Sequence, residues 1–94
     1  MNEKIYLTIL FDYYEKLLTE KDQECFKAYY FDNLSLGEIS ELVNISRNAI
    51  HKRLKKIEEK LKYYEEILGL YQKEQKIMSL IKDESLKEKI KEIL

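Results

Sequence analysis

Proline is absent from this 94-residue chain, and glycine occurs only as Gly37 and Gly69. β-Sheet proteins need more of both residues, because the tight turns between strands depend on them. Leucine, isoleucine, lysine and glutamate dominate instead, a composition that favours helices. With 45% hydrophobic residues, a chain of this length can form one modest core. We therefore expect an all-α fold, a small helical bundle in a single domain over residues 1–94.

Cysteine and histidine each occur only once, as Cys25 and His51. A disulfide within the chain and a zinc site made of Cys and His are excluded by these counts. The sequence also has no glycine-rich phosphate loop and no catalytic pair at a meaningful spacing, so we predict no enzymatic activity and no cofactor. The alternative to this prediction is that Cys25 is a catalytic nucleophile activated by His51. The apolar neighbours of Cys25 in the sequence favour a buried structural thiol instead.

Long apolar runs are also missing. No stretch approaches the roughly 20 apolar residues that cross a bilayer. The amino-terminal residues 1–4 lack the basic start and the apolar run of a signal peptide. Together with the lone cysteine, these absences lead us to expect a soluble, cytoplasmic protein that does not insert into membranes.

Apolar residues recur at helical spacing along most of the chain. Three Ser or Thr residues are each followed three positions later by an acidic residue, which is the pattern that caps the start of a helix: Thr19 with Asp22, Ser35 with Glu38, and Ser85 with Glu88. Gly69 indicates a break or kink, because glycine is unfavourable inside a helix. These signals predict six helices, at approximately residues 3–18, 20–32, 36–43, 47–68, 70–82 and 86–94.

The stretch from Ser35 to Leu61 predicts a helix-turn-helix motif, with no wing. Asn44 tolerates the left-handed conformation that ends a helix, and Ser46 can cap the next helix. A turn of three to four residues between two such helices is the spacing of this motif. We place the motif within residues 19–57 and a C-terminal helical extension at 58–94. Its core is expected to comprise Ile39, Val43, Ile45, Ile50 and Leu54.

Two apolar features allow two interpretations each. Tyr13 and Tyr14 could form a stacking platform for bases, or could pack in the core with their hydroxyls at the surface, which we favour. The repeat of Ile57, Leu61, Tyr64 and Leu68 extends beyond what the short first helices can cover, and it predicts a homodimer. Alternatively, the residues after Gly69 fold back and cover this repeat within one chain.

The net charge is only −1, but the charges are unevenly placed. Residues 1–43 contain four Lys or Arg against nine Asp or Glu, whereas residues 44–62 contain seven against two. A basic helix inside an otherwise acidic protein indicates a localised positive surface that is suited to nucleic acid. The alternative is that these lysines only keep an exposed helix soluble.

Seven residues at the start of the second motif helix are candidate nucleic-acid ligands. The first amides of a helix favour a phosphate, and Arg and Asn side chains suit the edges of guanine and adenine. Lysines further along the helix are assigned to phosphates, and Arg53 to a flanking contact or to solvent. The candidates are Ser46, Arg47, Asn48, His51, Lys52, Lys55 and Lys56.

These motifs resemble known proteins. One resemblance is to region 4 of bacterial sigma factors. It is carried by the run from Leu18-Thr19 through Tyr29-Tyr30, Leu34 to Ile39 and Ile45-Ser46-Arg47 to Leu61. The chain from Leu10-Phe11-Asp12-Tyr13-Tyr14 to about Gln75 is similar to the small YlxM-like helix-turn-helix family of Gram-positive bacteria. Members of that family are encoded beside genes of the signal recognition particle, from which a regulatory role in that pathway has been inferred.

The residues and the resemblance together predict a regulatory protein that binds DNA or structured RNA through the helix that begins after Ser46. The resemblance implies a role in the signal recognition particle pathway. The alternative is an adaptor that binds a signal recognition particle protein without sequence-specific DNA binding. The basic face favours nucleic acid, because a helix used only for protein contact would more often show exposed apolar anchors.

Overall fold

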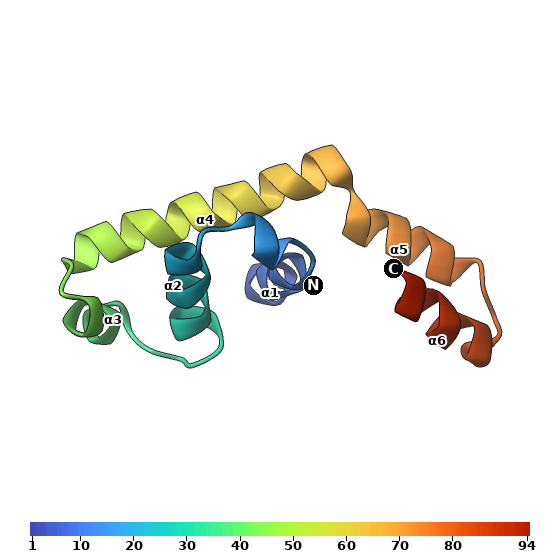
Figure 1. Cartoon of the computed structure of the whole chain (residues 1–94), viewed down its shortest axis with the longest axis horizontal. Helices are drawn as coiled ribbons and strands as arrows, with labels where there is room; N and C mark the ends of the chain where they lie inside the picture. The colour runs from blue at the N-terminus through green and yellow to red at the C-terminus, as the bar shows by residue number, and fades with distance from the viewer.

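The computed structural model describes all 94 residues and contains six α-helices and no strand, which confirms the all-α prediction (Figure 1). A short 3₁₀ turn, η1, follows the first helix. The elements are α1 (Glu3–Tyr14), η1 (Glu15–Leu17), α2 (Glu20–Tyr30), α3 (Leu36–Val43), α4 (Arg47–Leu68), α5 (Leu70–Ser79) and α6 (Glu84–Ile93).

The longest helix, α4, runs along most of an elongated molecule with extents of 49 × 24 × 24 Å. Figure 1 shows α1, α2 and α3 on the same side of α4, and each of the three packs against it. Beyond the end of α4 the chain bends, and α5 and α6 form a hairpin at the far end of the molecule (Figure 1). The helix-turn-helix and the hairpin therefore lie at opposite ends of α4.

Most of the predicted helix starts and stops are confirmed. Ser35 and Glu38 form a complete capping box, with each side chain bonded to the other residue's amide at 3.1 Å. Thr19 accepts a hydrogen bond from the amide of Asp22 at 3.1 Å. Asn44 is left-handed, with φ of 55°. Local sequence therefore fixed these boundaries, because each of these bonds joins residues close together in the chain.

Four boundaries differ from the prediction by two residues or more. α2 ends at Tyr30 rather than at residue 32. α1 ends at Tyr14 rather than near residue 18, because the chain tightens into η1 and then becomes extended at Leu18. α5 ends at Ser79, short of residue 82. The Ser85 cap is wrong: Asp83 accepts from the amides of residues 85 and 86, and α6 begins at Glu84.

The core is one cluster formed by α1, α2, α3 and α4. Ile39, Ile50 and Leu54 are buried as predicted, and Ile45 is half-buried. Val43 was predicted to be buried but is 51% exposed. It lies one turn after Ile39 on the same face of the short α3, at a cavity between α2 and α3 that no neighbouring helix fills. The twelve buried apolar residues are Leu7, Leu10, Phe11, Tyr14, Leu18, Cys25, Phe26, Ile39, Ile50, Leu54, Ile57 and Leu61.

Tyr14 is buried in this core, but its hydroxyl is not at the surface as predicted. The hydroxyl donates a hydrogen bond to Glu65 at 2.5 Å, and Glu65 is itself only 3% exposed. Burial and this hydrogen bond raise the pKa of Tyr14 to about 12, so the hydroxyl stays protonated and remains a donor at neutral pH. Tyr14 is therefore a structural residue and does not offer a surface for base stacking.

The bend between α4 and α5 depends on the same pair of side chains. Gly69 is left-handed, with φ of 61°, which favours glycine because it has no Cβ. The Glu65 carboxylate accepts from the amides of Tyr71 and Gln72 at 3.2 and 3.1 Å, and the Tyr14 hydroxyl accepts from the amide of Leu70 at 3.1 Å. A carboxylate from α4 and a tyrosine from α1 thus cap the start of α5.

The apolar repeat of α4 is covered mainly by the first helices, and the chain after Gly69 packs against α1. Ile57 and Leu61 are fully buried in the core. The Tyr71 ring packs edge-on against Tyr6 and Tyr13, with centroid distances of 6.0 and 6.1 Å. Tyr64 is half-buried against Tyr14, whereas Leu68 remains 41% exposed. The chain after Gly69 therefore folds back onto α1, and the first helices cover more of the α4 repeat than the sequence suggested, up to Tyr64.

Replacing Glu65 by glutamine should destabilise the protein by about 1–3 kcal/mol, because an amide group cannot accept all three hydrogen bonds that the carboxylate accepts. The measurement is the free energy of unfolding from denaturant titration followed by circular dichroism. The exposed neighbour Glu66 is the matched control, and Glu66→Gln should stay within about 0.5 kcal/mol of wild type. Equal effects of the two substitutions would show that the buried cap does not hold the bend.

Candidate nucleic-acid interface

The turn between α3 and α4 is held by Ser40 as well as by Asn44. The Ser40 hydroxyl donates to the carbonyl of Ile45, and the Ser40 carbonyl accepts from the amide of Ile45 at 3.2 Å. The sequence suggested only a left-handed Asn44 at this point. Ser40 therefore fixes the direction in which α4 leaves the turn.

The amino terminus of α4 is open to solvent and carries no acidic residue in its first turn. Ser46 caps the helix by accepting from the amide of Ala49 at 3.2 Å. The amides of Arg47 and Asn48 have no acceptor within the helix, because the first amides of any α-helix lack one. The helix dipole adds a partial positive charge here, so this end of α4 suits a phosphate.

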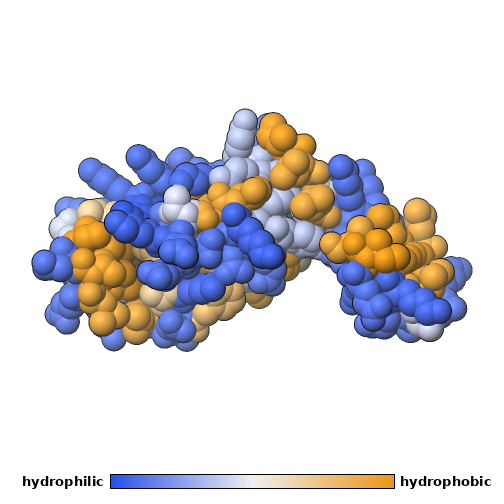
Figure 2. Space-filling model, viewed as in Figure 1, coloured by the Kyte–Doolittle hydropathy of each residue, from blue (hydrophilic) through white to orange (hydrophobic).

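The structure places all seven candidate residues on the exposed surface at the beginning of α4. Ile50 and Leu54 point from the same turns into the core, so the candidates occupy the outer side of the helix. Figure 2 shows hydrophilic surface along this part of the molecule. The sequence thus predicted correctly that these side chains share one accessible face.

Ion pairs divide the cations of α4 into two groups. Towards the middle of the helix, Lys60 pairs with Asp22 at 3.0 Å and Lys62 pairs with Glu3. Arg47, Lys52 and Lys56, nearer the start, take part in no ion pair. The free positive charge is therefore concentrated in the first half of α4.

Lys55 is intermediate between these groups. Its amino group lies 3.9 Å from Glu58, which also accepts a hydrogen bond from the Tyr30 hydroxyl at 2.9 Å. Burial and this hydrogen bond raise the pKa of Tyr30 above its ordinary value, so Tyr30 remains a donor to Glu58. An exposed pair at this distance is weak, and Lys55 can exchange it for a phosphate.

Arg47 is positioned by the start of α3. A Cβ atom built on Gly37 would lie 3.9 Å from the Cδ and Nε atoms of Arg47. The Arg47 side chain therefore runs beside the first turn of α3, where a Cβ atom at position 37 would make only an ordinary van der Waals contact with it. This contact brings a guanidinium close to a second helix start, which also favours anions.

His51 and Arg53 lie on opposite flanks of the exposed face. His51 lines a small cleft of about 110 Å³ together with Tyr29, Tyr30 and Leu36. Arg53 is half-buried and lines a separate apolar cavity between α2 and α3. Arg53 also lines a groove with Lys52 and Lys56, so it borders the exposed residues at the start of α4.

Comparison with known proteins agrees with this architecture. Residues 1–93 match the model of the UPF0122 family, which is described as "Putative helix-turn-helix protein, YlxM / p13 like". The chain belongs to the UPF0122 family. The family description names a helix-turn-helix protein and no enzyme class, and it confirms the YlxM-like resemblance.

Relatives with this family name occur in several bacteria. The UPF0122 protein of Caldanaerobacter subterraneus subsp. tengcongensis is 47% identical over 90 residues, which cover 96% of this chain and 72% of the relative. The Listeria welshimeri protein is 42% identical over 96 residues, covering 94% of this chain and 87% of the relative. The match to the Thermoanaerobacter pseudethanolicus protein covers 80% of this chain and 64% of that relative.

None of the helices of this UPF0122 protein combines the length and the apolar character that a membrane span requires.

Proposed function

We propose that this UPF0122 protein is a regulatory protein that binds duplex nucleic acid, DNA first of all, through the first half of α4. The observation that carries the proposal is the division of charge along this helix. Arg47, Lys52 and Lys56 near its start are exposed and unpaired, whereas Lys60 and Lys62 further along are paired with acidic residues of α2 and α1. Cations without protein partners are available to replace the counterions of a phosphate backbone.

The residues at the start of α4 divide into base-reading and phosphate-binding roles. Arg47 and Asn48 lie in the first turn, and Lys52 in the second, where a recognition helix meets base edges in the major groove. The free amides beside Ser46 bind a phosphate. Lys55 and Lys56 follow along the helix and contact the phosphate backbone of the nucleic acid. His51 contacts the nucleic acid from the flank of the helix next to α2.

A protein adaptor is the second candidate function. The observation that favours it is the exposure of Leu42 and Val43 on α3, since exposed apolar side chains often contact a partner protein. A signal recognition particle protein is the partner that the family resemblance suggests. Two results together would establish the adaptor function. The protein would bind no DNA or RNA pool in a salt-sensitive manner, and it would retain such a partner after nuclease treatment.

Two substitutions separate the proposed roles. Arg47→Ala should weaken binding to a preferred duplex by about 1–3 kcal/mol and relax its sequence preference, because a base contact is lost. Lys55→Ala should weaken binding to all sequences alike and reduce the slope of log affinity against log salt by about one, because one phosphate contact is lost. Fluorescence anisotropy with selected and random duplexes at several salt concentrations measures both effects.

The control is Lys73→Ala, an exposed lysine on α5 outside the proposed interface. Its affinity and salt slope should equal those of wild type. If Lys73→Ala weakens binding as much as Lys55→Ala does, the interaction is only general charge attraction and the interface on α4 is wrong.

Pairing of two copies through the α5–α6 hairpin is part of the proposal. Leu80 and Ile93 are each 84% exposed, and Leu86 and Leu94 are also exposed. Figure 2 shows apolar surface on this hairpin, away from the hydrophilic start of α4. A homodimer would cover this surface and leave both recognition helices free for half-sites of one duplex.

Sedimentation velocity at tens of micromolar should show a dimer for the wild-type protein. Leu80→Ser should shift the protein to monomer, because it removes apolar contact area from the hairpin. Leu42→Ser, at an exposed site on α3 outside the hairpin, should leave the dimer intact. A wild-type protein that stays monomeric throughout this range would contradict the dimer.

A further inference from the structure

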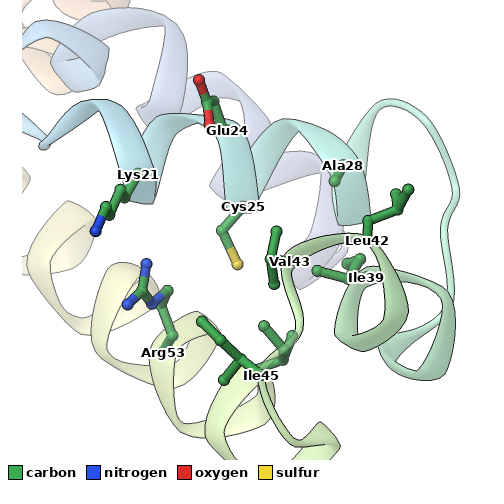
Figure 3. A pocket seen from close by; sticks show the side chains of 10 residues that line it. Lys21, Glu24, Cys25, Ala28, Ile39, Leu42, Val43, Ile45 and Arg53 are labelled. Atoms are coloured by element: carbon green, nitrogen blue, oxygen red, sulfur yellow. The ribbon is translucent and has the colours of Figure 1, made fainter.

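A cavity of about 370 Å³ lies between α2, α3 and the start of α4, on the side of α4 that carries Arg53 (Figure 3). Seven of its ten lining residues are hydrophobic. The walls include Cys25 and Ala28 from α2, Ile39 and Leu42 from α3, and Ile45 from the turn. The exposure of Leu42 and the half-burial of Ile45 leave one side of the cavity accessible from solvent.

The size of the cavity suits a small organic molecule. Binding pockets for small ligands are commonly about 300–1,000 Å³ and mostly apolar, with a few polar groups that fix the orientation of the ligand. This cavity lies at the lower end of that range. It therefore fits a compact ligand whose larger part is apolar.

The polar groups of the cavity are concentrated at one end and are cationic. Figure 3 shows the amino group of Lys21 and the guanidinium of Arg53 pointing towards one another there. Neither residue takes part in an ion pair. Glu24 belongs to the same lining, but its carboxylate points away from the cavity in Figure 3.

The remaining titratable group of the cavity does not offset this charge. Burial raises the pKa of the Cys25 thiol above its ordinary value, so Cys25 is neutral at pH 7. Arg53 is half-buried between the apolar walls and the solvent. A guanidinium in this setting is suited to a carboxylate, which it can bind through two parallel hydrogen bonds.

We propose that this cavity binds a small amphiphilic carboxylate of the fatty-acid type. The carboxylate lies between Arg53 and Lys21, and the alkyl chain extends along Cys25 and Ile39 towards Leu42. The site adjoins the exposed face of α4, because Lys21 and Arg53 also line the groove that contains Lys52. The proposal does not depend on nucleic-acid binding.

The test is a titration of the full-length ¹⁵N-labelled protein with sodium decanoate, below the concentration at which decanoate forms micelles. Saturable shifts are expected for the amides of Cys25, Ile39 and Arg53. Decanol, which has the same chain length without the charge, should bind about tenfold more weakly, because the charge-assisted hydrogen bonds are absent. Arg53→Gln should weaken decanoate binding by about the same factor.

Lys52→Gln is the matched control, since it removes a cation from the neighbouring position of the same helix but not from the cavity lining. Its affinity for decanoate should equal that of wild type. The proposal is overturned if decanoate causes no saturable shifts, if decanol binds as tightly as decanoate, or if Lys52→Gln and Arg53→Gln weaken binding equally.

Discussion

Four side chains on the inner side of α4 hold the molecule together: Ile50, Leu54, Ile57 and Leu61 are each at most 3% exposed. Helices α1, α2 and α3 all pack against α4, so a single helix connects every part of the core. Full burial of an aliphatic side chain contributes about 1.5–3 kcal/mol to the stability of the fold. This row therefore supplies a large share of the stabilising free energy that a small domain can gain from burial. Because the row faces inward, the opposite side of the same turns must face solvent.

This division of α4 also explains its electrostatics. Where α1 and α2 flank the helix, their acidic residues neutralise Lys60 and Lys62. At its beginning, α4 extends past these helices, and Arg47, Lys52 and Lys56 form no ion pair. The end of α4 is fixed separately, because Glu65 and Tyr14 cap the start of α5 and set the bend at Gly69. The rigid core, the basic end and the hairpin thus follow from the position of one helix.

The sequence predicted those features that depend on neighbouring residues. The Ser35 capping box and the left-handed Asn44 each involve groups only a few positions apart, and the exposed face of α4 follows from helical periodicity alone. The role of Glu65 could not be predicted, because Tyr14, its partner, lies 51 positions away in the chain. The same reason applies to the ion pairs that neutralise the later lysines. Val43 was misplaced because periodicity identifies an apolar face but not how much of it a neighbouring helix covers.

The central claim is that the first half of α4 is the surface that meets nucleic acid. Chemical-shift mapping of the ¹⁵N-labelled protein with a pool of short DNA duplexes tests it most directly, because each amide reports its own surroundings. The account predicts that the shifts concentrate at Ser46 to Lys56 and at the start of α3, and that they disappear as salt is raised. Shifts confined to the α5–α6 hairpin, or none with either DNA or RNA duplexes, would contradict it.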